Sequence, residues 1–339
     1  MTRAAVLQGI GGMVPPRIVS NAELAELVGG DDAWIRTRTG IHQRHWADPG
    51  TVTGDLAVAA GERALESAGA DTVDLVILAT STPDQPMPAT APEIATRLGV
   101  GAPWAYDLSA ACAGFVYGLA NAAGAIAAGT AERVLVIGAD IWSTRLNHED
   151  RASAVIFGDG AGAAVLRAGD PAEPGAFQGF DLGGDGRFRE LGLLAAGGSR
   201  QRSHREPPRD EDNLLLLRGK DIFTHAVKHM SASSARLLRR VGWEAASVDR
   251  FVGHQANVRI LRTVAELLAV DRERVLVHLD RVGNTSAASI PLALTDAAAR
   301  GTLGTGDRVL LTAFGAGLNW GSAAVSWPDI KVAPVLGDR

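Results

Sequence analysis

Cys112, the only cysteine in the 339-residue chain, is the residue whose type and position best suit nucleophilic chemistry. An apolar run ending in Asp107-Leu108 leads into it, and an Ala/Gly-rich helical stretch follows from Gly114 to about Ala128. This pattern predicts a thiol in the first turn of a helix, at a strand-to-helix junction. Free N–H groups and the positive end of the helix dipole favour a thiolate there. A buried structural cysteine is the alternative, because cysteine also packs as a small apolar residue.

Two further polar residues lie at expected junctions in the second half of the chain. His254 ends an apolar run and precedes a helix expected from about Asn257 to Leu268, and open α/β sheets place their chemistry at such strand ends. Asn284 begins a later helix, where a plain N-cap is the alternative. A cysteine, a histidine and an asparagine at three junctions together predict a thiol-based active site.

A weak internal repeat predicts the elements that position these residues. Two pairs of segments match at one offset of 175 residues, namely 73–78 with 248–253 and 132–138 with 307–313. Such a period indicates two copies of one domain rather than a solenoid. Within each half, short Val/Ile/Leu runs alternate with longer helical stretches, which predicts buried, mostly parallel strands in a layered α/β fold.

The repeat also predicts where the halves divide and how the site residues are related. The boundary is expected near 169–175, which divides the chain into residues 1–170, carrying the cysteine, and 171–339, carrying the histidine and asparagine. The offset makes Cys112 and Asn284 near-equivalent. The two helix N-termini are therefore expected to meet at a pseudo-twofold axis.

Composition excludes several function classes. With 46% hydrophobic and 21% charged residues, the chain has an ordinary globular composition, and no apolar run reaches the roughly 18 residues of a spanning helix. Residues 1–10 are typical of a strand rather than a signal peptide. A single cysteine excludes an internal disulfide and fits a reducing cytoplasm. The net charge of −5 argues against general nucleic-acid binding. We therefore expect a cytoplasmic protein without membrane or nucleic-acid partners.

Six segments in this order make the chain similar to β-ketoacyl-[acyl-carrier-protein] synthase III, a condensing enzyme of the thiolase superfamily: 34–41, 111–115, 156–162, 254–257, 283–288 and 314–318. The resemblance runs nearly end to end, from residue 9 to about residue 327. It implies an α/β thiolase fold of two pseudo-twofold-related, layered α-β-α-β-α halves.

The resemblance implies a two-step acyl transfer. Cys112 is acylated by an acyl-CoA primer, and malonyl-loaded acyl carrier protein (ACP) then loses CO2 and condenses with the acyl group to give 3-oxoacyl-ACP. His254 and Asn284 are expected to stabilise the enolate oxygen, and the backbone N–H groups of Cys112 and Ala316 a second oxyanion. No metal or organic cofactor is expected. The product would initiate a fatty-acid or polyketide chain.

The resemblance also implies the binding residues: for CoA, Trp34, Arg38, Arg151 and Asn257; for the primer pocket, Met87 and Phe157; for ACP docking, Arg259. Met87 would enter the pocket of a second subunit, so a homodimer is implied. Thr224 and Glu266 depart from the family, which often carries basic residues at these positions, and Glu266 would repel an acidic carrier. The Arg- and Pro-rich loop 197–212 is expected to be a solvated, exposed loop, with a lid over the site as the alternative. Together with 217–219 it is unusual for the family, which suggests a primer beyond acetyl-CoA or a dedicated pathway.

Four other kinds of protein are alternatives to a condensing enzyme. A relative that passes the Cys112-bound acyl group to an alcohol or amine would need the same thiol, although the intact Asn284 segment favours condensation. A thiolase would need a second catalytic cysteine, and a hydroxymethylglutaryl-CoA synthase an acidic base near the cysteine. A non-catalytic subunit would have lost its nucleophile.

Overall fold

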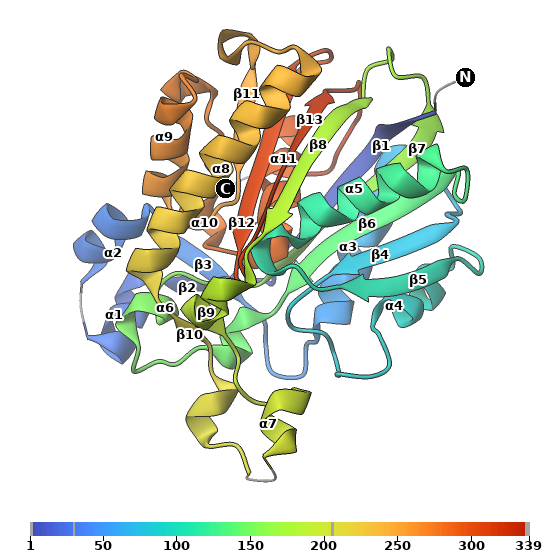
Figure 1. Cartoon of the computed structure of the whole chain (residues 1–339). Coiled ribbons are helices and arrows are strands. Elements are labelled where there is room, and N and C mark those ends of the chain that lie inside the picture. The colour runs from blue at the N-terminus through green and yellow to red at the C-terminus, as the bar shows by residue number, and fades with distance from the viewer. Residues whose placement is uncertain (1–2, 30, 205–206, 336–339) are drawn as a thin grey trace.

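Two β-sheets organise the computed structural model, which describes residues 3–29, 31–204 and 207–335 (Figure 1). The first sheet has the order β1-β7-β6-β4-β5 and the second β11-β12-β13-β8. In the first, the strands are β1 (Ala4–Met13), β4 (Leu75–Ala79), β5 (Trp104–Leu108), β6 (Arg133–Asp140) and β7 (Gly160–Gly169). In the second, they are β8 (Phe177–Gly184), β11 (Arg250–Gly253), β12 (Arg308–Gly315) and β13 (Asn319–Ser326). β4 runs parallel to β5 and β6, and β11 parallel to β12, whereas β7 and β13 are antiparallel to their neighbours.

Eleven α-helices are assigned among the described residues: α1 (Asn21–Val28), α2 (Asp32–Thr39), α3 (Thr53–Ala68), α4 (Ala91–Leu98), α5 (Gly114–Ala127), α6 (Arg151–Ala154), α7 (Ser199–Ser203), α8 (Gly219–Val241), α9 (Val258–Leu267), α10 (Leu279–Val282) and α11 (Ser289–Ala299). Two short antiparallel pairs complete the fold, β2 (Arg17–Ser20) with β3 (Gln43–Trp46) and β9 (Gly192–Leu193) with β10 (Leu216–Leu217). No helix in the described part of the chain is long and apolar enough to cross a membrane.

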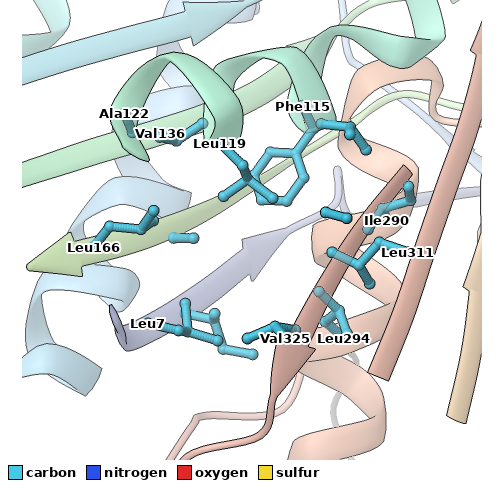
Figure 2. Packing of buried hydrophobic residues seen from close by; sticks show 14 of the residues in the cluster. Leu7, Phe115, Leu119, Ala122, Val136, Leu166, Ile290, Leu294, Leu311 and Val325 are labelled. Atoms are coloured by element: carbon cyan, nitrogen blue, oxygen red, sulfur yellow. The ribbon is translucent and has the colours of Figure 1, made fainter. Parts of the chain in front are cut away.

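The helices and sheets stack in five layers, α-β-α-β-α, as predicted. α5 and α11 pack between the two sheets, α3 and α4 cover the outer face of the first, and α8 and α9 cover the outer face of the second. Figure 2 shows the central layer, in which Phe115 and Leu119 of α5 face Ile290 and Leu294 of α11.

Side-chain patterns explain these layers. All five residues of β4, Leu-Val-Ile-Leu-Ala, are buried, as expected for a parallel strand covered on both faces. α5 is apolar or small around most of its circumference because sheets flank it on two sides. α9 carries its apolar residues on one face and its charges on the other, as suits an outer helix.

The internal repeat is visible in the element boundaries. β6 and β12 begin 175 residues apart, as do the 3-10 turns Ala111–Ala113 and Ser286–Ala288 and the helices α5 and α11 that follow them. At this offset Ala111 corresponds to Ser286, so the counterpart of Cys112 is Ala287. The expected near-equivalence of Cys112 and Asn284 is therefore three residues out of register. The division into residues 1–170 and 171–339 stays a prediction.

The loop 197–212 contains α7 and part of the 3-10 turn Asp210–Asn213. Residues 205 and 206 lie outside the described residues. The described side chains of the loop are mostly exposed, and α7 lies apart from the two sheets, at the bottom of the view in Figure 1. None of the described residues of this loop lines the cavity described below.

Candidate active site

A strained turn carries Cys112 between β5 and α5. β5 ends at Leu108, and the 3-10 turn Ala111–Ala113 precedes the first α-helical residue, so the thiol sits in this turn rather than in α5 itself. Ala111 has a φ of 47°, a backbone torsion that residues other than glycine rarely adopt. The end of β12 packs directly on the turn, since a Cβ atom on Gly315 would lie 2.7 Å from the Cys112 backbone nitrogen. Residue 315 must therefore be glycine for this contact to form.

The same turn recurs at Ser286, where φ is 52°. The two turns meet, as the pseudo-twofold axis predicts, because Ser286 Oγ lies 3.5 Å from Cys112 Sγ. The positive φ at both positions is a shared backbone feature of the two halves. It brings a hydroxyl from the second half against the thiol of the first.

Asn284 is held by backbone bonds to the segment 156–158. Its N–H donates to Ile156 O at 2.9 Å, and its own carbonyl accepts from Gly158 N at 3.0 Å. A Cβ on Gly158 would clash with the carbonyl oxygen of Val282, so only glycine fits there. Asn284 Oδ1 accepts from Ser286 N–H at 2.9 Å. The side-chain amide is thereby oriented with Nδ2 as its remaining donor.

His254 follows β11, where its backbone N–H donates to Thr312 O at 2.8 Å. Its ring nitrogen Nδ1 lies 2.7 Å from the Ser289 hydroxyl at the start of α11. The residue is buried, and this burial lowers the pKa of the imidazole to about 3. His254 is therefore neutral at pH 7.

Cys112, His254 and Asn284 line one cavity of about 450 Å³. Its remaining walls are largely apolar and come from both halves, including Trp142, Phe157, Leu193, Leu194, Leu215, Leu217, Ile222, Phe223, Met230 and Phe314. Ala316 also lines this cavity, beside Gly315. The three residues predicted as catalytic thus come together at one site, with room for a thioester.

The prediction that Cys112 is a thiolate is wrong for the free protein. Although Cys112 is only partly buried as a residue, burial of its sulfur raises the pKa of the thiol to about 12. The hydrogen bond with Ser286 lowers this pKa, and the Asp140 carboxylate raises it. Local position at a helix start favours the thiolate, but removal of the sulfur from water has the larger effect. Cys112 is therefore a protonated thiol at neutral pH.

Asp140, at the end of β6, is a buried carboxylate that sequence reasoning missed. Its Oδ1 accepts from Ser81 N at 2.7 Å, from the N–H and hydroxyl of Thr82 at 3.1 and 3.0 Å, and from the Thr80 hydroxyl at 3.2 Å. Its Oδ2 accepts from Ala287 N at 3.2 Å. Burial raises the pKa of this carboxyl, and the hydrogen bonds lower it. Asp140 ties the loop after β4 to the Ser286–Ala288 turn. A lone Asp ending an apolar run was the only sequence signal for it.

Three of the four residues predicted for CoA, Trp34, Arg38 and Arg151, lie outside the cavity. The Arg151 guanidinium lies 3.8 Å from the centre of the Trp34 ring, and that of Arg38 lies 5.7 Å from it. Asn257 lines the cavity, caps α9 by accepting from Arg259 N, and donates to Arg38 O at 3.0 Å. Asn257 therefore links the Trp34 group to the cavity.

The remaining predicted residues occupy three different environments. Phe157 lines the cavity and packs against Trp142 with ring centres 5.4 Å apart. Arg259 is exposed, and its guanidinium lies 5.6 Å from the ring of Phe223, which lines the cavity. Met87 is 85% exposed and does not line this cavity.

Comparisons with known proteins place this geometry in a family. Residues 106–186 match the family described as 3-oxoacyl-[acyl-carrier-protein (ACP)] synthase III, and residues 238–327 match its C-terminal family. A curated relative from Streptomyces coelicolor, "Beta-ketoacyl-[acyl-carrier-protein] synthase III 5", is 57% identical over 97% of this chain and 99% of its own length.

Two solved structures extend the likeness to the fold. The 3-oxoacyl-(acyl carrier protein) synthase III of Pseudomonas aeruginosa PAO1 superimposes with a TM-score of 0.90 at 47% identity, covering 98% of this chain and 100% of that one. The priming β-ketosynthase of the R1128 polyketide pathway gives a TM-score of 0.91 at 34% identity, covering 97% and 98%. The chain belongs to the β-ketoacyl-ACP synthase III family of the thiolase superfamily.

Proposed function

We propose that the protein starts acyl chains by decarboxylative condensation of a Cys112-bound acyl group with malonyl-ACP. As a member of its family, the chain is an acyl-transferring condensing enzyme. The observation that carries the detailed proposal is the convergence of Cys112, His254 and Asn284 on one cavity, with the Asn284 amide oriented to donate. A nucleophile and a pair of donors are the groups that the two steps require.

In the first step, Cys112 Sγ attacks the thioester carbon of an acyl-CoA. The new C–S bond forms as the bond to the CoA sulfur breaks, and the proton of the thiol leaves with CoA as its own thiol. Ser286 Oγ, 3.5 Å from Sγ, can accept the S–H hydrogen bond before transfer. The backbone N–H groups of Cys112 and Ala316 would stabilise the tetrahedral oxyanion, an interaction typically worth about 2.7–4 kcal/mol per donor.

In the second step, malonyl-ACP loses its carboxylate as CO2, which leaves an enolate on the thioester. His254 Nε2–H and the Asn284 amide would donate to the enolate oxygen, and neutral His254 suits this role because it keeps a ring N–H without adding a charge. The enolate carbon attacks the acyl carbonyl, the bond to Sγ breaks, and the Cys112 thiolate takes a proton from water. Neither step requires a metal or an organic cofactor.

For CoA, we propose that Trp34 and Arg38 hold the adenine end by stacking and charge, while Arg151 binds the nucleotide phosphates. The guanidinium that now covers Trp34 is close enough to pair with a phosphate beside the ring. Asn257 would then contact the pantetheine arm on its way into the cavity. Phe157 and its neighbour Trp142 would bound the primer.

For protein partners, we propose a homodimer and an acidic carrier. β5 is an edge strand of the first sheet with Trp104 half-exposed, and Met87 is exposed on the connection that precedes α4. An unpaired edge with exposed apolar side chains suits pairing with a second copy, which would bring Met87 to the primer pocket of that copy. Arg259, exposed near the cavity wall, would meet ACP, while Glu266 on the same helix weakens this attraction. A cytoplasmic location is part of the same proposal.

Intact-protein mass spectrometry tests the proposal. The protein is exposed to a panel of straight, branched and aromatic acyl-CoAs, with Cys112→Ala as the control, and malonyl-ACP is then added. We expect one acyl adduct, absent from Cys112→Ala, that disappears as 3-oxoacyl-ACP forms. An adduct that clears only with an alcohol or amine would replace condensation by simple acyl transfer. No adduct with any primer would overturn the acyl-CoA step.

A further inference from the structure

Ser289, the first residue of α11, contacts the ring of His254 on the side away from the cavity. Its side chain is 1% exposed and does not line the cavity. Its Oγ lies 2.7 Å from Nδ1 of His254 and accepts from the backbone N–H of Gln255 at 3.3 Å. No other hydrogen bond to this hydroxyl is found among the described residues.

The direction of the hydrogen bond between Ser289 Oγ and His254 Nδ1 follows from the single hydrogen of the hydroxyl. A serine hydroxyl has one hydrogen to donate and two lone pairs. One lone pair takes the Gln255 N–H, which can only donate. The hydrogen needs an acceptor, and the described residues offer the hydroxyl no acceptor other than Nδ1 of His254. Nδ1 therefore accepts, and a neutral imidazole that accepts at Nδ1 carries its hydrogen on Nε2.

We infer that Ser289 is a positioning residue that holds His254 as the Nε2–H tautomer and so supplies one of the two donors for the enolate oxygen. This inference rests on the proposed condensation. The other neutral tautomer would present a lone pair to the developing negative charge and repel it. Ser289 thus acts on the second step through His254, whereas acylation of Cys112 uses backbone donors and does not depend on the tautomer.

Nitrogen-15 NMR of the wild-type protein tests the tautomer directly. Protein labelled with 15N-histidine is examined at pH 7, and His254→Gln identifies the His254 signals by their absence. We expect a pyridine-type Nδ1 and a pyrrole-type Nε2. The reverse assignment would overturn the inference without any variant of Ser289 and without any activity measurement.

Kinetics of two Ser289 variants test the consequence. In Ser289→Ala we expect the condensation rate to fall at least tenfold, toward the 10²- to 10³-fold limit for loss of one oxyanion donor. Acylation of Cys112 should stay within threefold of wild type. Ser289→Thr keeps the hydroxyl and should recover most of the condensation rate. Thr295→Val, which removes a buried hydroxyl of the same helix that bonds only to Pro291 O among the described residues, should condense at the wild-type rate.

The outcomes separate this inference from the proposed function. If the wild type acylates but never condenses, the proposed function fails. If the wild type condenses and Ser289→Ala condenses equally fast with an unchanged His254 spectrum, only the role of Ser289 fails. If Ser289→Ala does not fold, Ser289→Thr and the wild-type spectrum still decide.

Discussion

Substituting Gly315 by alanine should impair the nucleophile without touching any reacting atom. The added Cβ would lie 2.7 Å from the Cys112 nitrogen and 3.0 Å from the carbonyl oxygen of Ala110, and both atoms belong to the backbone. An ordinary contact is 3.4 Å or more, so the two segments must separate by about 0.7 Å. The turn that moves carries a proposed oxyanion donor, and a misplacement of about 1 Å typically costs 10²-fold in rate.

We therefore expect Gly315→Ala to slow acylation of Cys112 by about 30- to 100-fold. Overpacking at a buried contact typically destabilises by about 1–3 kcal/mol, so the fold should survive. Acylation is followed by intact-protein mass spectrometry under single-turnover conditions, and stability by denaturant unfolding.

Gly124→Ala provides the matched control. Gly124 lies in α5, the helix that follows Cys112, and a Cβ there meets no atom within 4 Å. This variant should acylate normally and gain about 0.4–1 kcal/mol in unfolding free energy. Acylation of Gly315→Ala within threefold of wild type, at unchanged stability, would refute the reasoning.

Four further results follow from the site. Because the pKa of the Cys112 thiol is about 12, its alkylation by iodoacetamide should quicken about tenfold per pH unit from pH 7 to 10, and a plateau near pH 8 would contradict this. Burial lowers the pKa of His254 from 6.5 to about 3, so its neutral form stabilises the fold above pH 6.5 and this stabilisation is lost as pH falls toward 3. The unfolding free energy should drop by about 2 kcal/mol more in wild type than in His254→Gln between pH 7 and 5. Asp140→Asn should lower the free energy of unfolding by about 1–3 kcal/mol, because an amide nitrogen cannot accept the hydrogen bonds that the carboxylate accepts. The same variant should alkylate faster at Cys112 at pH 8, because it removes a negative charge that raises the pKa of the thiol. Slower alkylation would argue against that charge effect. Trp34→Ala should raise KM for acyl-CoA about tenfold while leaving acyl-pantetheine unaffected, and equal losses for both would exclude adenine stacking.

The sequence predicted those features that depend on local pattern and on repetition. The layered fold, the helix Gly114–Ala127 and the position of His254 after a strand all follow from runs of residue types, and the structure confirms them. The meeting of the two helix starts follows from the repeat alone, since Ser286 and Cys112 are in contact.

The depth at which single atoms are buried and the backbone torsions of the turns could not be predicted from the sequence. The raised pKa of Cys112 depends on how deeply its sulfur is buried, which no local motif reveals. The positive φ at Ala111 is invisible in the sequence because alanine does not favour it. The register error between Cys112 and Asn284 has a different origin, since the offset of 175 residues already pairs Cys112 with Ala287. Asp140 and Ser289 act through contacts with residues distant in the chain, so their roles appear only once the halves are packed.

The contact between the two strained turns has a consequence for biosynthesis. Ser286 is 174 residues downstream of Cys112, and β12, which packs on the cysteine turn, ends only at Gly315. All strands of the first sheet, the last of which ends at Gly169, are therefore synthesised before Ser286 and Gly315. Until then Cys112 lacks both the neighbouring hydroxyl of Ser286 and the proposed oxyanion donor of Ala316. The cavity takes its walls from both halves, so the proposed acylation of Cys112 requires the second half to be synthesised and folded.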